Sequence, residues 1–236
     1  MAVINGYELS EREQSLNVIN LPSLENLAKE ILPKGGFEFI RGGSEDEWTL
    51  RENTIAFDRV QILPHVLSNI SEPETKTSIF GLQLDTPLVM APAAAQGIAH
   101  IRGEAATAEG MAATGSLMTQ STYSSKLIAD AAAAGHGAPQ FFQLYLSQDN
   151  DLNKFLLDKA KEAGSKAIVI TTDLTAEGYR EADIVNDFHF PLPMANLEDY
   201  QVGLGQSDAG VGHGKDVFDN EAHQIGVSDI KRIIDY

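Results

Sequence analysis

The sequence predicts an α/β fold with parallel strands, and three observations carry this prediction. Four short apolar stretches follow one another from residue 87: PLVMA (87–91), GSLMT (115–119), QFFQLY (140–145) and AIVIT (167–171). Their central residues, Val89, Leu117, Phe142 and Val169, are 28, 25 and 27 residues apart. Each interval also holds an Ala-rich or amphipathic segment of helical character. Strand–helix units repeated with short connections imply parallel strands joined by right-handed crossovers.

Both a doubly wound sheet and a (β/α)8 barrel fit this repeat. The first strand is followed by APAAAQG, which lacks the G-x-G-x-x-G pattern of dinucleotide-binding folds. The helical segments between the strands are EAATAEGMAATG, SSKLIADAAAAG and NDLNKFLLDKAKEAG. We expect Gly115, Gly135 and Gly164 to close them, since glycine is favoured where a helix ends.

The part before residue 81 predicts helices and one hairpin. LPSLENLAKEI (Leu21–Ile31) begins with Pro-Ser and spaces its apolar residues as an amphipathic helix does. We expect a short helix over Phe37–Ile40, another over Glu45–Phe57 and a hairpin over Thr75–Leu84. Residues 1–17 are polar and are expected to form a loose arm. The predicted division is therefore 1–80, a helical segment with a hairpin, and 81–236, the repeating strands and helices.

After the fourth strand the pattern loosens. Phe188–Gly214 is rich in Pro, Gly, Asn and Asp, and its length favours a lid or binding loop. Ser228–Tyr236 predicts a further helix, with Ser228 or Asp229 as its cap.

Composition limits the partners. The 236 residues carry 34 acidic and 17 basic side chains, a net charge of −17, so nucleic acid and anionic membrane surfaces are not expected partners. No cysteine is present, which excludes thiolate nucleophiles and cysteine-ligated metals. The six histidines are scattered without helical i, i+4 pairing, and no metal site is predicted. The N-terminal residues lack the pattern of a secretory signal, so we expect a cytoplasmic protein.

Polar or small residues follow every predicted strand, at the end where parallel α/β folds place their chemistry. Small residues suit the approach of a flat ligand, and neutral amide and hydroxyl groups suit a polar heteroaromatic ring. An arginine beside a tyrosine suits a substrate carboxylate. Asp173 and Arg180 also have a structural interpretation, as a turn residue and as a surface partner of Glu181. The candidates are Pro92, Ala93 and Ala94 after the first strand, Ser121 after the second, Gln143 and Tyr145 on the third, and Thr171, Asp173 and Arg180 after the fourth.

Five stretches of this sequence resemble one family. APAAAQGIAH, GSLMTQSTY, QFFQLY and ITTDLTAEGYREAD are similar to motifs of the FMN-dependent L-2-hydroxy-acid oxidases and dehydrogenases, in the same order. GGFEFIRGGSEDEWTLREN resembles the N-terminal segment of that family, and of its lactate oxidases in particular. The resemblance runs from about residue 20 to the end, and it implies a (β/α)8 TIM-barrel architecture. It also implies FMN as cofactor and a small 2-hydroxy acid as substrate. We further expect a homo-oligomer.

The resemblance assigns roles position by position. Pro92, Ala93 and Ala94 match the flavin-contacting loop, with the backbone of Ala94 near the reactive edge. Ser121, Gln143 and Thr171 match flavin hydrogen-bonding positions. Tyr145 and Arg180 match substrate-binding positions, and Asp173 matches the carboxylate that partners the catalytic histidine. Phe39 stands where the family has a substrate-contacting tyrosine, so that hydroxyl is lost.

The sequence contains no match to the family's later motifs, which hold the lysine of strand five, the catalytic histidine and arginine, and the phosphate site. We therefore expect a truncated half-barrel with four parallel strands, an N-terminal helical cap and a hairpin, which is inactive alone and binds FMN weakly. The alternative is a non-catalytic half-barrel that self-associates through its open sheet edges. A phosphate-binding barrel lyase or aldolase is a further alternative, but no lysine lies at a strand end.

Overall fold

The computed structural model describes residues 13, 15–174, 178–203 and 225–236. The loose arm expected over residues 1–17 therefore lies almost entirely outside the described residues. The chain divides into two compact units. Met1–Thr75 and Gly178–His189 form the first, and Lys76–Glu177 and Phe190–Tyr236 form the second.

The first unit is helical. The helix α1 (Leu21–Ile31) has the predicted bounds, and the side chain of Asn20 caps it by accepting a hydrogen bond from the backbone N–H of Ser23 at 2.9 Å. The helix α2 (Lys34–Arg41) extends beyond the predicted range at both ends. The unit is completed by α3 (Trp48–Ile55), the 3-10 helix η1 (Ala56–Arg59) and α7 (Glu181–Val185).

The prediction of one helix over Glu45–Phe57 was wrong at both ends. Glu45 and Glu47 have φ of 53° and 57°, in the left-handed region, so α3 starts only at Trp48. The segment then tightens into η1 at Ala56 and does not continue as an α-helix.

The second unit contains the predicted hairpin and the predicted parallel sheet. Strands β1 (Thr77–Ile79) and β2 (Leu82–Leu84) pair antiparallel. A four-stranded parallel sheet follows in chain order, confirming the strand arrangement: β3 (Val89–Met90), β4 (Leu117–Gln120), β5 (Gln140–Tyr145) and β6 (Ile168–Thr171). β3 is shorter than the stretch 87–91 predicted for it.

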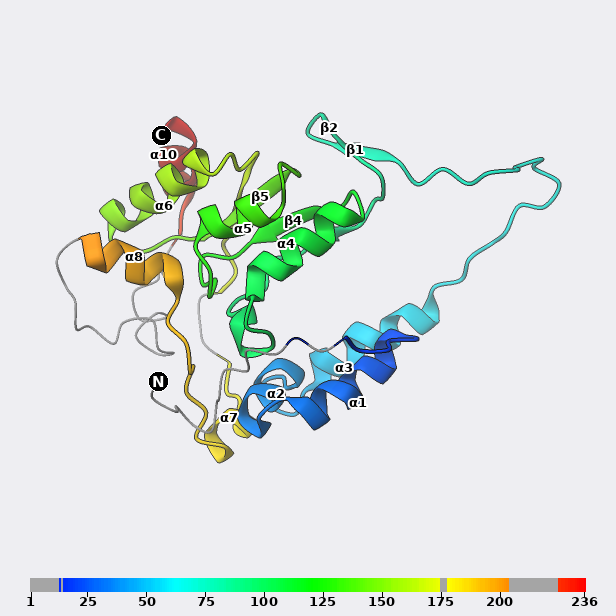
Figure 1. The fold of residues 1–236 in the computed structure, drawn as a ribbon, viewed down its shortest axis with the longest axis horizontal. Coiled ribbons are helices and arrows are strands. Elements are labelled where there is room, and N and C mark those ends of the chain that lie inside the picture. The colour runs from blue at the N-terminus through cyan, green and yellow to red at the C-terminus, as the bar shows by residue number, and fades with distance from the viewer. Residues whose placement is uncertain (1–12, 14, 175–177, 204–224) are drawn as a thin grey trace. The chain divides into compact units, whose positions relative to one another are not determined.

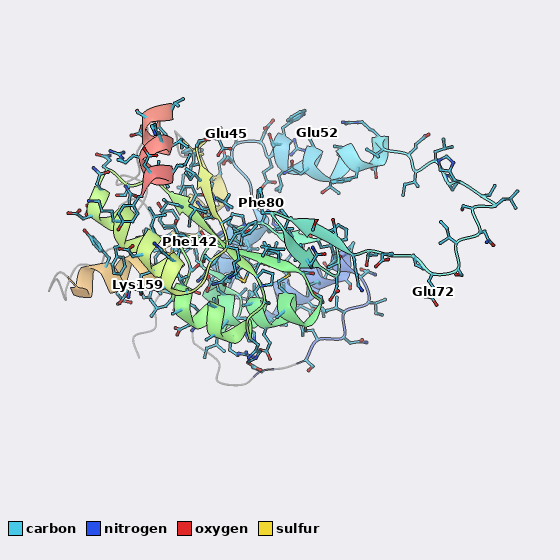
Figure 2. The ribbon with its side chains drawn as sticks, turned by 90° about the horizontal axis from the view of Figure 1, so that it is seen from above. Glu45, Glu52, Glu72, Phe80, Phe142 and Lys159 are labelled. Atoms are coloured by element: carbon cyan, nitrogen blue, oxygen red, sulfur yellow. The ribbon has the colours of Figure 1, made fainter. Side chains whose placement is uncertain are left out.

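Helices follow these strands and pack on one face of the sheet. They are α4 (Gly103–Ala113), α5 (Ile128–Ala134) and α6 (Asn150–Glu162), which Figure 1 shows beside β4 and β5. Phe142 and Leu144 of β5 pack with Leu156 of α6, and all three are fully buried. Figure 2 shows Phe142 within a dense group of side chains. The 3-10 helix η2 (Gln96–Ile98) lies in the connection between β3 and α4.

Alternate residues of each strand point to the face of the sheet opposite these helices. Leu117 and Phe141 form an apolar cluster there with Leu84 of β2, toward the amino ends of the strands. Further along, Ser121, Gln143 and Thr171 occupy the same face at the carboxyl ends. The face of the sheet opposite the helices therefore changes from apolar at the amino ends of the strands to polar at their carboxyl ends.

The two outer strands are open. Val89 of β3 and Val169 of β6 are 42% and 37% exposed, whereas Leu117 and Phe141 on the middle strands are 0% and 4% exposed. In a closed barrel every strand has a neighbour on each side. The higher exposure of the outer-strand residues, together with the parallel sheet and its helices, is consistent with a partial (β/α)8 barrel.

Two expectations for the later part of the chain were wrong. The region expected as a loop over Phe188–Gly214 contains the helix α8 (Ala195–Gly203), whose Leu197 packs with Met194 against Ala95. The last helix, α10 (Val227–Asp235), is capped by Gly226 and not by Ser228 or Asp229. The carboxylate of Asp229 instead accepts a hydrogen bond from the Gly226 N–H at 2.9 Å. Residues 204–224 lie outside the described ranges.

Candidate functional site

A row of neutral polar side chains crosses the carboxyl ends of three adjacent strands in the second unit. The amide oxygen of Gln143 accepts hydrogen bonds from the Ser121 hydroxyl and the Thr122 N–H, both at 3.2 Å. Its amide nitrogen donates to the hydroxyl of Thr171 at 2.9 Å. Gln143 is 0% exposed. These contacts bring together the three residues that the resemblance assigned to flavin hydrogen-bonding positions.

Thr122 is a member of this row that the sequence analysis missed. Its hydroxyl donates to the backbone carbonyl of Gln143 at 2.7 Å and accepts from the N–H of Tyr145 at 3.1 Å. It therefore ties the end of β4 to the end of β5. Its place directly after Ser121 was the signal available in the sequence.

Tyr145 lies at the end of β5 and is half-buried. Its ring stacks on that of Tyr123 with the centroids 4.9 Å apart and the planes 13° from parallel. Asp173 lies two residues after the end of β6 and is exposed to solvent.

The loop after β3 presents small residues to solvent. Pro92, Ala93 and Ala94 are exposed, whereas Ala95 is 1% exposed and has a left-handed φ of 49°. The N–H of Ala95 donates to the carbonyl of Tyr123 at 2.9 Å, which joins this loop to the loop after β4. A ligand can approach this backbone closely because the exposed side chains are short.

Arg180 is held within the first unit. Its Nε donates to Oδ2 of Asp183 at 2.6 Å, and its Nη2 donates to the backbone carbonyl of Phe39. The guanidinium carbon lies 4.8 Å from the centroid of the Phe39 ring, which stacks on Phe188 at 5.1 Å. The surface pairing with Glu181 considered for Arg180 is replaced by this pair with Asp183.

Asp183 is a further residue that the sequence analysis missed. Its spacing from Arg180, three positions along a helical stretch, was a usable signal. Among the described residues, no hydrogen-bond partner reaches its buried Oδ1. These contacts use the Nε and the Nη2 of Arg180 and do not involve its Nη1.

The donor set of the second unit fits the ring system of a flavin. Ser121, Gln143 and Thr171 are neutral groups that both donate and accept hydrogen bonds, as the polar edge of an isoalloxazine requires. None of them is charged, so they suit the ring and not the phosphate of FMN.

A cavity of about 250 Å³ lies elsewhere in this unit, between α6, the start of β6 and α10. Its lining includes Leu157, Ala167 and Ile233. It therefore lies at the amino end of β6, away from the polar row. Across the described ranges, no helix has the length and apolar character needed to span a bilayer.

Comparison with known proteins adds independent findings. A family model described as FMN-dependent dehydrogenase matches residues 28–233. An L-lactate oxidase of Lentilactobacillus hilgardii is 57% identical over 237 residues, a match that covers 100% of this chain and 63% of that protein. Glycolate oxidase 1 of Zea mays is 38% identical over 188 residues, covering 79% of this chain and 51% of that protein.

The similar solved structures include a lactate oxidase and a mandelate oxidase. A refolded lactate oxidase of Pediococcus acidilactici has a TM-score of 0.89 at 55% identity, covering 100% of this chain and 62% of that chain. A mandelate oxidase in complex with (S)-4-hydroxymandelic acid has a TM-score of 0.81 at 30% identity, covering 92% of this chain and 61% of that chain. The chain thus spans between about half and somewhat less than two thirds of the length of these proteins.

Proposed function

The chain belongs to the FMN-dependent dehydrogenase family, and we propose that its residues form part of a site that oxidises an L-2-hydroxy acid. L-Lactate is the proposed substrate, because the L. hilgardii relative is an L-lactate oxidase. FMN is the cofactor of the family. When bound, it accepts the two electrons removed from the substrate. The proposed products are pyruvate and, with oxygen as the final acceptor, peroxide.

The polar row of the second unit is the observation that carries this proposal. Gln143 is fixed by Ser121, Thr122 and Thr171, and it cannot rotate without breaking several hydrogen bonds. We assign Ser121, Gln143 and Thr171 to the polar edge of the flavin. The loop Pro92–Ala94 is assigned to its reactive edge, where the backbone of Ala94 would make the contact. Hydrogen-bonding groups held in place in this way would orient a bound ring.

The substrate roles rest on Arg180, Tyr145 and Asp173. Arg180 would bind the substrate carboxylate through its Nη1 edge, and the phenol of Tyr145 would donate a hydrogen bond to the substrate. Asp173 would orient the base that removes the hydroxyl proton. Phe39 supports the guanidinium of Arg180 through its ring and carbonyl, and it offers the substrate no hydroxyl.

The base itself and the anchor for the FMN phosphate are expected from the part of the relatives that this chain does not match. We therefore propose that the 236-residue polypeptide binds FMN weakly and is inactive alone.

The test is a completed chimera, in which this chain is joined to the part of the L. hilgardii relative that lies beyond its match. We expect the chimera to bind FMN and to release peroxide with L-lactate, but not with D-lactate. Gln143→Leu in the chimera should lower the affinity for FMN. An unaltered chimera that folds but binds no FMN would contradict the proposal.

The open sheet favours a second candidate, a non-catalytic half-barrel that self-associates. Val89 and Val169 on the outer strands are partly exposed, and unpaired strand edges pair readily with another chain. Sedimentation of the 236-residue polypeptide tests this candidate. We expect an oligomer that becomes weaker with Val89→Thr and Val169→Thr. A monomer at every concentration would remove this candidate and the proposed homo-oligomer of this chain.

A further inference from the structure

Glu104 is a buried acidic residue that none of the roles above uses. It lies in the first turn of α4, is 0% exposed, and accepts three hydrogen bonds. Its Oε1 accepts from the backbone N–H of Gln96 at 3.0 Å and of Ser125 at 2.9 Å. Its Oε2 accepts from the hydroxyl of Ser125 at 2.6 Å. The amino end of a helix also favours a negative charge at this position.

These contacts join two loops that lie far apart in the sequence. Gln96 belongs to the loop after β3, and Ser125 belongs to the loop after β4. The hydroxyl of Ser125 also accepts from the N–H of Gly97 at 2.8 Å. A single carboxylate and a single hydroxyl therefore fix two consecutive backbone N–H groups of the first loop.

Two glycines lie close to the side chain of Ser125. A Cβ added to Gly97 would meet Leu192 at 2.6 Å and Ser125 at 2.7 Å. A Cβ added to Gly103 would meet the Ser125 hydroxyl at 2.8 Å, and Gly103 has a left-handed φ of 45°. The loop after β3 is thus pressed directly against Ser125.

The network reaches the exposed part of the loop through Gln96. The side-chain nitrogen of Gln96 donates to the carbonyl of Ala93 at 3.1 Å, and its oxygen accepts from the hydroxyl of Thr107. The position of Gln96 is set by the Glu104 carboxylate on its own N–H. Glu104 therefore positions the backbone at Ala93 and Ala94 indirectly, through Gln96.

An acidic residue suits this place better than its amide. All three groups that face the carboxylate are donors, and a carboxylate only accepts. A glutamine would direct its own N–H₂ toward Ser125 and would disturb the hydroxyl that holds Gly97. A buried donor that loses its acceptor carries a penalty comparable to the bond itself.

We propose that Glu104, acting with Ser125, is a positioning residue that holds the loop Pro92–Gly97 in the conformation that receives the flavin ring. The part of this inference that concerns the ring rests on the proposed function. The part that concerns the loop does not, and it is tested without any cofactor.

The experiment is hydrogen exchange of backbone amides on the 236-residue polypeptide, before and after addition of FMN. The variants are Glu104→Ala, Glu104→Gln and Ser125→Ala, and the matched control is Asn153→Ala. Asn153 is also buried, at 3% exposed, and its amide oxygen and nitrogen hold the N–H and carbonyl of Ser147 after β5. A purely structural effect of a lost buried polar group would be seen with Asn153→Ala as well.

Without FMN, we expect Glu104→Ala and Ser125→Ala to accelerate exchange over residues 93–97 by about tenfold or more, relative to β5 and α6. Glu104→Gln should give a smaller acceleration, and Asn153→Ala should accelerate exchange near Ser147 only. If Glu104→Ala does not fold, the positioning role is tested by the exchange rates over residues 93–97 in Glu104→Gln and Ser125→Ala, compared with those in Asn153→Ala. Equal acceleration of residues 93–97 in all variants would overturn the proposal.

With FMN at saturating excess, we expect slower exchange over residues 93–97 in the unaltered chain and less slowing in Glu104→Gln and Ser125→Ala. Equal slowing in these variants would overturn the positioning role toward the ring. If FMN does not slow exchange over residues 93–97 in the unaltered chain or in the completed chimera, the flavin assignment fails. The result without FMN would still support the positioning of the loop by Glu104 and Ser125.

Discussion

The Nε of Arg180 donates to Oδ2 of Asp183 at 2.6 Å, and this contact fixes the orientation of the guanidinium. The two side chains are 28% and 17% exposed, and this partial burial limits screening of the pair by solvent. The ring and carbonyl of Phe39 complete the support. Preorganisation of this kind lowers the entropic cost of binding a carboxylate.

Arg180→Lys in the completed chimera is expected to raise KM for L-lactate by about tenfold or more, because a lysine cannot reproduce the planar fork. Asp183→Asn should raise KM less, since the amide oxygen can still accept from Nε. Steady-state kinetics measures both. Arg102→Lys is the control, because Arg102 pairs on the surface with Glu109. An Arg180→Lys variant with unchanged KM would show that Arg180 is not the carboxylate anchor.

Phe39→Tyr tests the lost hydroxyl. We expect the variant to bind L-lactate more tightly by about 0.5–1.5 kcal/mol, the usual net value of one hydrogen bond. The measurement is KM for L-lactate, together with the Kd of pyruvate, the proposed product, in the completed chimera. Phe188→Tyr is the control, because the ring of Phe188 stacks on that of Phe39. Tighter binding in both variants would indicate a general effect of polarity and not a restored contact.

The parallel sheet could be predicted from the sequence because its strands are apolar, short and regularly spaced. The four predicted centres all lie in observed strands, and Gly135 caps α5 as expected. The start of α3 could not be predicted, since it depends on left-handed backbone at Glu45 and Glu47, residues without a strong preference for it. α8 was missed because Pro, Gly and Asn surround a helix that is fixed by packing against Ala95.

The site was predicted unevenly for a similar reason. Ser121, Gln143 and Thr171 lie at the carboxyl ends of adjacent parallel strands, so strand order alone predicts their meeting. Asp183 and Glu104 act through contacts between loops or within a helix, which strand order does not specify. Glu104 in particular contacts Ser125, 21 positions later, and no spacing in the sequence indicates that pair.

Gln143→Leu tests the energetic role of the polar row. The change leaves the buried N–H of Thr122 and the hydroxyls of Ser121 and Thr171 without their partner. We expect the free energy of unfolding of the 236-residue polypeptide to fall by about 1–3 kcal/mol. Urea unfolding followed by circular dichroism measures it. Gln83→Leu on the exposed face of β2 is the matched control and should change stability by about 0.5 kcal/mol or less. Equal losses in the two variants would show that the row is not a stabilising network.

The last prediction is that the 236-residue polypeptide alone does not turn over L-lactate. General acid–base help is typically worth about 10²- to 10⁴-fold, and none of the six histidines of the sequence directly follows β3, β4, β5 or β6. The polar row suits the flavin ring but offers no charge to its phosphate, so FMN should be retained poorly. Peroxide release and flavin content are measured with and without added FMN and L-lactate, and the completed chimera serves as the positive control. A polypeptide that holds one FMN per chain and releases peroxide when L-lactate is added would contradict the prediction. This result would mean that copies of this chain rebuild the site by association across their open strands.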